Sequence, residues 1–439
     1  MRTARRLLAV AGVFPPFGGP GAVRMVKLFK HLPRHGWEVD VIAPGGRAGW
    51  YPDQSLAAEL GSTTVVRVGR TTAASTLATR VRTLAKDHNA QAPWLQALRL
   101  AMRPARRLRD TVSIPDEYLL WATAAWRRGG ALARARPYDA LFTSSFPYSV
   151  HLAGLAIARQ TGLPWVVELR DPWRGNSFRR QTRPWRLRLD GWLEALVLSC
   201  AREIVALTPG TLSALAGRYP AEIKTKLHLI TNGFDPDDYG AAPAPTPGKP
   251  LQLLYVGTFE QPLQPPDTFL AALGAMLSAR PAIADAVELR VLGGADLASG
   301  AQIGAWRDAH PATSMLTLQP FVPHLEATAA MLAADALVLS VAAGAAWVLT
   351  SKVFEYLGSG RPIVAVVPDG DCRDLLTRCG GATLFYPGDV AGLAAYLLRA
   401  IDDGHRLPTP PQNAQAVRAL AWPELAANLA GILDQATRS

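Results

Sequence analysis

A lysine and a glutamate stand three residues apart in the stretch Ser351 to Ile363, SKVFEYLGSGRPI, which lies between two apolar segments. If a helix begins at Lys352, then Lys352 and Glu355 share one face of its first turn. The helix dipole disfavours a cation at this end, and an anionic ligand would remove that penalty. The pair suits a ligand with phosphates for the lysine and vicinal hydroxyls for the glutamate. A nucleotide sugar is such a ligand.

The same two residues also have structural explanations. A capping box would need a glutamate three residues after Ser351, where the chain has Phe354 instead, so we expect no capping box. A plain ion pair between Lys352 and Glu355 remains open.

A glycine-rich loop, residues 17–21, follows the first apolar run and precedes a helical pattern over residues 21–36. Glycines let backbone N–H groups approach an anion, and a helix N-terminus attracts one. The spacing is not that of a dinucleotide-binding loop, because Arg24 occupies the position of the third glycine. A plain tight turn explains the loop equally well.

Charged residues also end the apolar run 164–169, where Glu168, Arg170 and Asp171 stand close together. The carboxyl end of a parallel strand is the edge at which open α/β sheets bind ligands. An Arg–Asp pair that only fixes the loop is the alternative. Further along, Asn232 and Gly233 predict a tight turn.

The elements that must position these residues alternate between short apolar runs and amphipathic helical stretches, which predicts an α/β fold with parallel sheets. Strands are expected at residues 7–14, 38–44, 63–69, 140–145, 164–169 and 203–208, and then at 251–257, 287–293, 316–322, 336–341, 362–367 and 382–386.

The 439 residues exceed the roughly 250–300 residues that one hydrophobic core serves, so two domains are expected. A Pro- and Gly-rich segment near the middle of the chain indicates a linker. Ligands commonly bind in the cleft between two such domains. The predicted limits are a first domain at 1–232, a linker at 233–250, a second domain at 251–415 and a final helix at 416–439.

The formal net charge is +11, and basic residues crowd the segments 99–109, 126–137 and 179–189. Solvated arginine-rich helix faces are one explanation. The other is a surface for an anionic membrane, which is favoured over nucleic acid because Trp and Leu accompany the charge and no nucleic-acid-binding motif does.

The three cysteines are too few and scattered for a disulfide framework or a zinc site, which favours a reducing, cytoplasmic setting. The N-terminal apolar run is expected to be a buried strand and not a signal peptide, and no membrane span is predicted.

The whole chain resembles the GT-B retaining glycosyltransferases of family 4. The matching stretches are FPPFGGPGAVRMVKLFKHL (14–32), IPDEYLLW (114–121), the run 144–173, ITNGFD (230–235), LLYVGTFE (253–260) and SKVFEYLGSGRPIVAV (351–366). The resemblance implies two Rossmann-like domains whose parallel sheets face one another across a cleft. It also implies that the first domain binds the acceptor, that the second binds the donor, and that a final helix crosses back to the first.

The resemblance further implies roles for single residues. Gly18 and Gly19 would lie against the donor diphosphate, Ser351 and Lys352 would flank it, and Glu355 would bind the ribose. No metal or other cofactor is implied, because helix dipoles and basic side chains would supply the positive charge. The expected catalytic residues are Arg170 and Asp171, and the expected donor-binding residues are Gly18, Gly19, Arg24, Asn232, Gly257, Thr258, Ser351, Lys352 and Glu355.

Two positions depart from the family's pattern. The family's second glutamate falls on Trp347, and Thr258 follows Gly257 where an Arg and a Lys usually come after the strand. The candidates to replace those two cations are Arg24, Arg170, Lys352 and Arg361.

The implied function is retaining transfer of a sugar from a nucleotide sugar to a glycan, a lipid-linked glycan or a small molecule. Cell-surface polysaccharide, glycolipid or secondary-metabolite biosynthesis would be the setting, in the cytoplasm or at the inner face of the plasma membrane. The two departures motivate an alternative, a non-catalytic GT-B protein that binds a nucleotide sugar or partners an active enzyme. A sugar-nucleotide epimerase is disfavoured because its acid and base groups have no place in the sequence.

Overall fold

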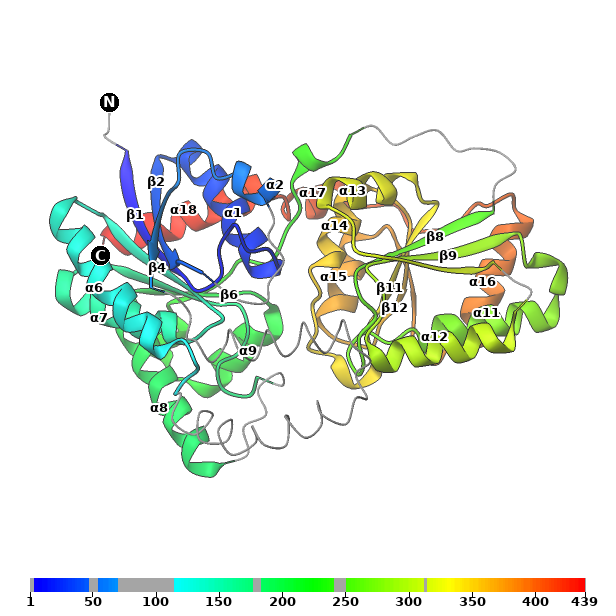
Figure 1. The fold of residues 1–439 in the computed structure, drawn as a ribbon, viewed down its shortest axis with the longest axis horizontal. Coiled ribbons are helices and arrows are strands. Elements are labelled where there is room, and N and C mark those ends of the chain that lie inside the picture. The colour runs from blue at the N-terminus through cyan, green and yellow to red at the C-terminus, as the bar shows by residue number, and fades with distance from the viewer. Residues whose placement is uncertain are drawn as a thin grey trace. The chain divides into compact units, whose positions relative to one another are not determined.

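The computed structural model describes residues 4–46, 54–69, 114–176, 183–240, 250–311 and 314–438. The chain forms two compact units (Figure 1). Unit 1 contains Met1–Thr231 and Leu425–Ser439, and unit 2 contains Asn232–Glu424. The basic segment 99–109, part of the basic segment 179–189 and half of the predicted linker, residues 241–249, lie outside the described residues.

Unit 1 is built on a seven-stranded parallel sheet in the order β3-β2-β1-β4-β5-β6-β7. The order reverses beside β1, so the switch point lies between β1 and β4. The strands are β1 (Arg5–Ala11), β2 (Trp37–Pro44), β3 (Thr64–Val68), β4 (Ala140–Ser145), β5 (Trp165–Leu169), β6 (Glu203–Ala206) and β7 (Leu227–Leu229).

The central strands of unit 1 are buried along their whole length, as expected for a parallel sheet covered on both faces. The helices of the unit are α1 (Pro20–His31), the 3₁₀ turn η1 (Leu32–His35), α2 (Gln54–Ala58), α6 (Leu119–Ala135), α7 (Ser149–Thr161), α8 (Pro184–Cys200), α9 (Pro209–Arg218) and α10 (Ala221–Lys224).

Unit 2 is built on a six-stranded parallel sheet in the order β10-β9-β8-β11-β12-β13, so its switch point lies between β8 and β11. The strands are β8 (Leu251–Val256), β9 (Val287–Leu292), β10 (Leu316–Gln319), β11 (Ala336–Ser340), β12 (Ile363–Val366) and β13 (Ala382–Phe385).

Two hydrophobic clusters cover opposite faces of this second sheet, since neighbouring residues such as Leu253 and Leu254 belong to different clusters. The helices are α11 (Asp267–Ala279), α12 (Leu297–Ala309), α13 (His324–Ala333), α14 (Lys352–Ser359), α15 (Asp371–Cys379), α16 (Val390–Asp402) and α17 (Ala414–Arg418), with 3₁₀ turns η2 (Pro236–Asp238), η3 (Pro281–Ile283) and η4 (Ala343–Ala345).

The last helix, α18 (Trp422–Arg438), begins in unit 2 and ends in unit 1. Within unit 1, Asp434 accepts a hydrogen bond from Trp37 Nε1 at 2.9 Å and forms an ion pair with Arg5 at 2.6 Å. Gln435 Nε2 donates to Glu203 Oε1 at 3.1 Å. The predicted helix that crosses back to the first domain is confirmed. It starts later than expected, because the separate helix α17 precedes it.

The α/β class and all twelve expected strands are confirmed, and the short strand β7 was not predicted. No helix among the described residues is both long and apolar enough to cross a membrane.

Candidate functional site

The loop from β1 to α1 places glycines at the positive end of a helix. Gly19 is the N-cap of α1, with φ at 117°, and its carbonyl accepts from the N–H groups of Ala22 and Val23 at 2.9 and 3.1 Å. The first turn of α1 has no acidic residue and no side-chain cap. Gly18 and Gly19 therefore lead into a helix N-terminus whose dipole no side chain of the turn balances.

Arg170, directly after β5, packs against this same helix end. A Cβ atom on Gly21 would lie 1.4 Å from Arg170 Nη1, so the guanidinium fills the space that a side chain would need. Arg170 Nε donates to the carbonyl of Ser145, and Nη2 donates to that of Phe146 at 3.3 Å. Burial lowers the pKa of Arg170, although the charges of Asp171 and Glu168 favour its protonated form. Arg170 is half-buried, and a cation at the positive end of a helix is a place where an anion would be stabilised.

Asp171 follows in a loop that aromatic side chains hold. The Tyr148 hydroxyl donates to the carbonyl of Pro172 at 2.7 Å, and the Tyr148 ring stacks on Trp173 at 4.9 Å between centroids. Burial raises the pKa of Asp171, and the neighbouring charge of Arg170 partly offsets this. The loop thus holds a carboxylate and a guanidinium side by side at the carboxyl edge of the sheet.

Arg24 occupies a different environment from Arg170. Its Nε and Nη2 donate to Glu168 Oε1 at 3.0 and 2.6 Å, and both side chains are buried. Arg24 also donates to the carbonyls of Ile230 and Thr231 at the end of unit 1. These contacts give Arg24 a structural function, and its predicted role in donor binding stays a prediction. Asn232, the first residue of unit 2, is half-buried.

In unit 2, the residue at the start of α14 is Lys352. The preceding Ser351 has helical backbone angles and makes no side-chain cap, so the expected absence of a capping box is confirmed. Within the described part of the chain, Lys352 Nζ donates to Tyr255 Oη at 3.0 Å and Gln264 Oε1 at 2.5 Å, and not to Glu355. Burial lowers the pKa of Lys352 to about 8, although Glu355 and Glu260 attract its charge.

Glycines at the ends of β8 and β9 make room for this lysine. Gly257 has φ at 116°, and a Cβ atom there would lie 2.3 Å from Lys352 Cε. Gly293 has φ at 117°, and its Cβ would lie 2.9 Å from the carbonyl of Gly257. The Thr258 hydroxyl is exposed and donates to the carbonyl of Gly293 at 3.2 Å. Only glycine fits the close approach of these two strand ends.

Glu355 is half-buried one turn into α14, and its backbone carbonyl accepts from the Tyr239 hydroxyl at 2.8 Å. Trp347, in the loop before α14, is 38% exposed. Arg361 follows the C-terminus of α14 and donates to the carbonyl of Leu332. It precedes β12 and so lies at the amino-terminal edge of the sheet. The hypothesis that Arg361 replaces a missing phosphate-binding cation is therefore wrong.

The structure thus gathers the expected residues into two groups, each at the carboxyl edge of its own sheet. Those in unit 1 are Gly18, Gly19, Arg170 and Asp171, and those in unit 2 are Gly257, Thr258, Ser351, Lys352 and Glu355.

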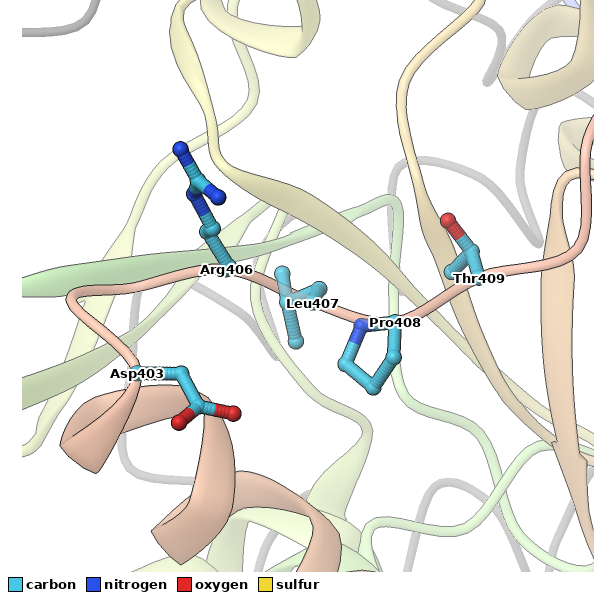
Figure 2. Close-up of a pocket in the computed structure, with 5 residues that line it drawn as sticks. All are labelled: Asp403, Arg406, Leu407, Pro408 and Thr409. Atoms are coloured by element: carbon cyan, nitrogen blue, oxygen red, sulfur yellow. The ribbon is translucent and has the colours of Figure 1, made fainter.

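Unit 2 has an open cavity of about 660 Å³ that none of these residues lines. Figure 2 shows the side chains that line it. Its lining residues come from the segment that follows α16, and that segment hydrogen-bonds to Gly381 and Thr383 at the start of β13. The cavity therefore lies by the amino end of a strand, away from the edge where α/β sheets bind ligands. The lining residues are Asp403, Arg406, Leu407, Pro408 and Thr409.

Sequence analysis missed the residues that surround Lys352, namely Tyr255, Gln264 and Gly293. The pair Gly293-Gly294 directly after an expected strand was a usable signal for a close backbone approach. Tyr255 and Gln264 carried no signal, because their function depends on a contact with a residue distant in sequence.

Two parallel Rossmann-like sheets and a final helix that returns to the first unit define the GT-B class of fold. Residues 21–238, about half of the chain, match the family model described as Glycosyltransferase Family 4. The chain belongs to this family and is a glycosyltransferase.

Solved structures share this fold along the whole chain. Sucrose-phosphate synthase from Thermosynechococcus elongatus is 15% identical with a TM-score of 0.61, covering 98% of this chain and 99% of that one. A glycosyltransferase from Rickettsia africae is 10% identical with a TM-score of 0.62, covering 98% of both chains. Anabaena HepE, solved in complex with UDP-glucose, is 14% identical with a TM-score of 0.55, covering 99% and 98%. None of the curated proteins matches the chain.

Proposed function

We propose that this protein is a retaining glycosyltransferase that moves a sugar from a nucleotide-sugar donor to an acceptor hydroxyl. The observation that carries the proposal is Lys352, a half-buried cation at the N-terminus of α14, beside the switch point of a parallel sheet. Glu355 follows one turn later, so a phosphate-binding cation and a hydroxyl-binding carboxylate lie on the same helix turn. The UDP-glucose complex of the Anabaena neighbour supports a nucleotide sugar as the ligand class.

In this proposal Lys352 and the backbone at Gly257 and Thr258 bind the donor diphosphate, and Ser351 contributes its hydroxyl there. Glu355 accepts hydrogen bonds from the ribose hydroxyls. Charged acceptors make hydrogen bonds about twice as strong as neutral ones, which favours a carboxylate for this task.

The groups of unit 1 serve the chemical step. The loop at Gly18 and Gly19 and the half-buried Arg170 neutralise negative charge that develops on the departing diphosphate. Fixed dipoles and cations are effective where water is excluded. A phosphate oxygen of the donor accepts the proton of the attacking hydroxyl, and the sugar passes through an oxocarbenium-like transition state. Asp171 orients the acceptor or stabilises the positive charge on the sugar. Neither a metal nor another cofactor is part of this proposal.

The acceptor is a glycan, a lipid-linked glycan or a small molecule, used in cell-surface polysaccharide, glycolipid or secondary-metabolite synthesis. We place the protein in the cytoplasm, peripherally bound to the inner face of the plasma membrane. Helix α8 supports this, since Trp185, Arg188 and Trp192 share one exposed face, with the two tryptophans 44% and 60% exposed. The two acidic residues of α8, Asp190 and Glu194, are buried.

Flotation with vesicles tests the membrane assignment. The protein should float with vesicles that contain anionic lipid, and salt should release it, because the attraction is screened. Replacing both exposed tryptophans, Trp185 and Trp192, by serine should abolish flotation. Equal recovery with neutral and anionic vesicles, or none with either, contradicts the assignment.

Donor binding is tested with a panel of nucleotide sugars and the variant Glu355→Ala. Loss of hydrogen bonds to a charged group costs about 1.5–3 kcal/mol, so affinity should fall about 10- to 100-fold. Glu326→Ala is the matched control, because Glu326 is an exposed glutamate in the first turn of α13. Unchanged affinity of the Glu355 variant would refute the assignment of this glutamate to the ribose.

A second candidate is a GT-B protein that binds a nucleotide sugar without transferring it. The observation that favours it is Trp347, which stands where the family has its second glutamate, together with Thr258 in place of the usual cations. Donor binding without turnover, when lipid and soluble acceptors are both supplied, would select this candidate.

A further inference from the structure

Lys352 is held by two side chains of another segment. Tyr255 is the penultimate residue of β8, and Gln264 lies in the loop that follows. Both accept hydrogen bonds from Lys352 Nζ, at 3.0 and 2.5 Å. The Tyr255 hydroxyl lies 3.2 Å from both the Thr258 carbonyl and Gln264 Oε1, so it donates to one of them. The ammonium also lies over the Tyr255 ring, 4.8 Å from its centroid. The lysine is therefore fixed in position and not free to sample rotamers.

Among the residues that the structure describes, no carboxylate is hydrogen-bonded to this lysine. Glu355 on its own helix and Glu260 in the loop after β8 attract it from a distance. The phenols that face the site, Tyr255 and Tyr356, stay neutral because burial raises the pKa of each. Within the described residues, neutral acceptors use two of the three N–H bonds of the ammonium, which leaves one for a ligand.

We propose that Tyr255 and Gln264 are positioning residues that aim the Lys352 ammonium at the donor diphosphate, and that donor binding weakens above neutral pH as this ammonium loses its proton. The inference rests on the proposed function and deepens it. The Arg and Lys that the family resemblance places after this strand are missing after Gly257, so Lys352 carries this task in unit 2.

The size of the pH effect follows from the population that can bind. Burial brings the pKa of Lys352 to about 8, so most molecules carry the ammonium at pH 7 and about a tenth carry it at pH 9. Affinity should therefore fall about tenfold over these two pH units. The ligand does not cause the fall, since phosphate esters lose their second proton near pH 6.

The test is calorimetric titration of the full-length protein from pH 6.5 to 9.5 at constant ionic strength. The probe is whichever of UDP, GDP and ADP binds most tightly at pH 7. We expect the tenfold fall in the unmodified protein and a flat profile for Lys352→Arg, because a guanidinium keeps its charge throughout this range. Lys224→Met, which removes an exposed lysine of unit 1, is the control and should retain the full fall.

The positioning residues have their own signature. Gln264→Leu and Tyr255→Phe remove acceptors that stabilise the ammonium, so the fall should move to lower pH. Tyr255→Phe keeps the ring that stacks on Phe259 at 3.8 Å, which protects the fold. Gln264→Glu places a carboxylate beside the ammonium, so its fall should move to higher pH. A merely structural role would weaken binding equally at every pH.

The outcomes distinguish failure of the inference on Lys352 from failure of the proposed function. A pH-independent affinity of the unmodified protein overturns the inference, as does a fall at the same pH in all three variants of Tyr255 and Gln264. Failure of every nucleoside diphosphate to bind at any pH contradicts the proposed function itself.

Discussion

Arg24 and Arg170 belong to the same unit but donate to different kinds of acceptor. Arg24 is buried against the carboxylate of Glu168, whereas the guanidinium of Arg170 donates to two backbone carbonyls. A buried charge with a hydrogen-bonded partner of opposite sign is satisfied, whereas the half-buried guanidinium of Arg170, whose described acceptors are backbone carbonyls, can still receive an anionic ligand. The difference favours a structural function for Arg24, and it agrees with the proposed role of Arg170 in catalysis.

The substitution Glu168→Gln tests the first half of this assignment. It leaves the Arg24 guanidinium buried without its counter-charge, which should cost about 3–5 kcal/mol of unfolding free energy. Urea unfolding, followed by hydrogen exchange in peptides of unit 1, measures the loss. Glu38→Gln is the matched control, because Glu38 forms an exposed pair with Arg6 and should cost less than about 1 kcal/mol. Equal losses in the two variants would contradict the assignment.

At the same scale, sequence reasoning recognises a residue by its type and by its near neighbours. The sequence showed the helical spacing of Lys352 and Glu355, and it showed that no glutamate stands three residues after Ser351. The structure confirms that Ser351 makes no side-chain cap. The partners of Lys352 were not visible, because Tyr255 and Gln264 lie 97 and 88 residues away. The different functions of Arg24 and Arg170 could not be predicted either, because they depend on the tertiary contact of Arg24 with Glu168.

At the scale of the elements, strands were the most predictable feature. Fully buried parallel strands read as continuous apolar runs, such as residues 336–340, and each such run became a strand. Strand β7 was not predicted, because Leu227–Leu229 has only three residues and gives no clear apolar run. Strand order, and with it the switch point beside β1 or β8, depends on pairings that the sequence does not encode locally.

The start of α1 gives a prediction that belongs to the element. Gly21→Ala should favour the helix, but the new Cβ would displace the Arg170 guanidinium, whose Nη1 atom would lie 1.4 Å away. Because Arg170 is assigned to charge on the departing diphosphate, turnover should fall about 10²-fold while the fold persists. Kinetics with the preferred donor, together with circular dichroism, measure the two effects.

Gly300→Ala in α12 is the control for this experiment. A Cβ atom there would meet nothing within 4 Å, so activity should be unchanged and stability should rise by about 0.5–1 kcal/mol. Full turnover of Gly21→Ala would remove Arg170 from the proposed chemistry.

At the scale of the whole molecule, the C-terminal helix α18 belongs to the core of unit 1, although the chain reaches it from unit 2. Leu429 and Leu433 are fully buried, and Asp434 satisfies both Trp37 and Arg5. The first unit is therefore complete only after the second unit has been synthesised.

Deleting residues 425–439 should expose the apolar surface that these leucines cover. We expect faster hydrogen exchange in β1 and β2 of unit 1 and unchanged exchange in β11 and β12 of unit 2. Arg438→Ala is the control, because this side chain is 76% exposed and its pair with Asp434 spans 3.9 Å. Protection that falls equally in both units would show that α18 does not belong specifically to unit 1.

The central claim is that this chain transfers sugar from a nucleotide donor with Lys352 and Arg170 as its phosphate-binding cations. The most direct measurement is release of nucleoside diphosphate from a panel of nucleotide sugars by the unmodified protein, Lys352→Met and Arg170→Leu, with Lys224→Met as control. The account predicts turnover of at least one donor, a loss of about 10²-fold or more in both cation variants, and full activity in the control. Turnover that survives in both cation variants would contradict it.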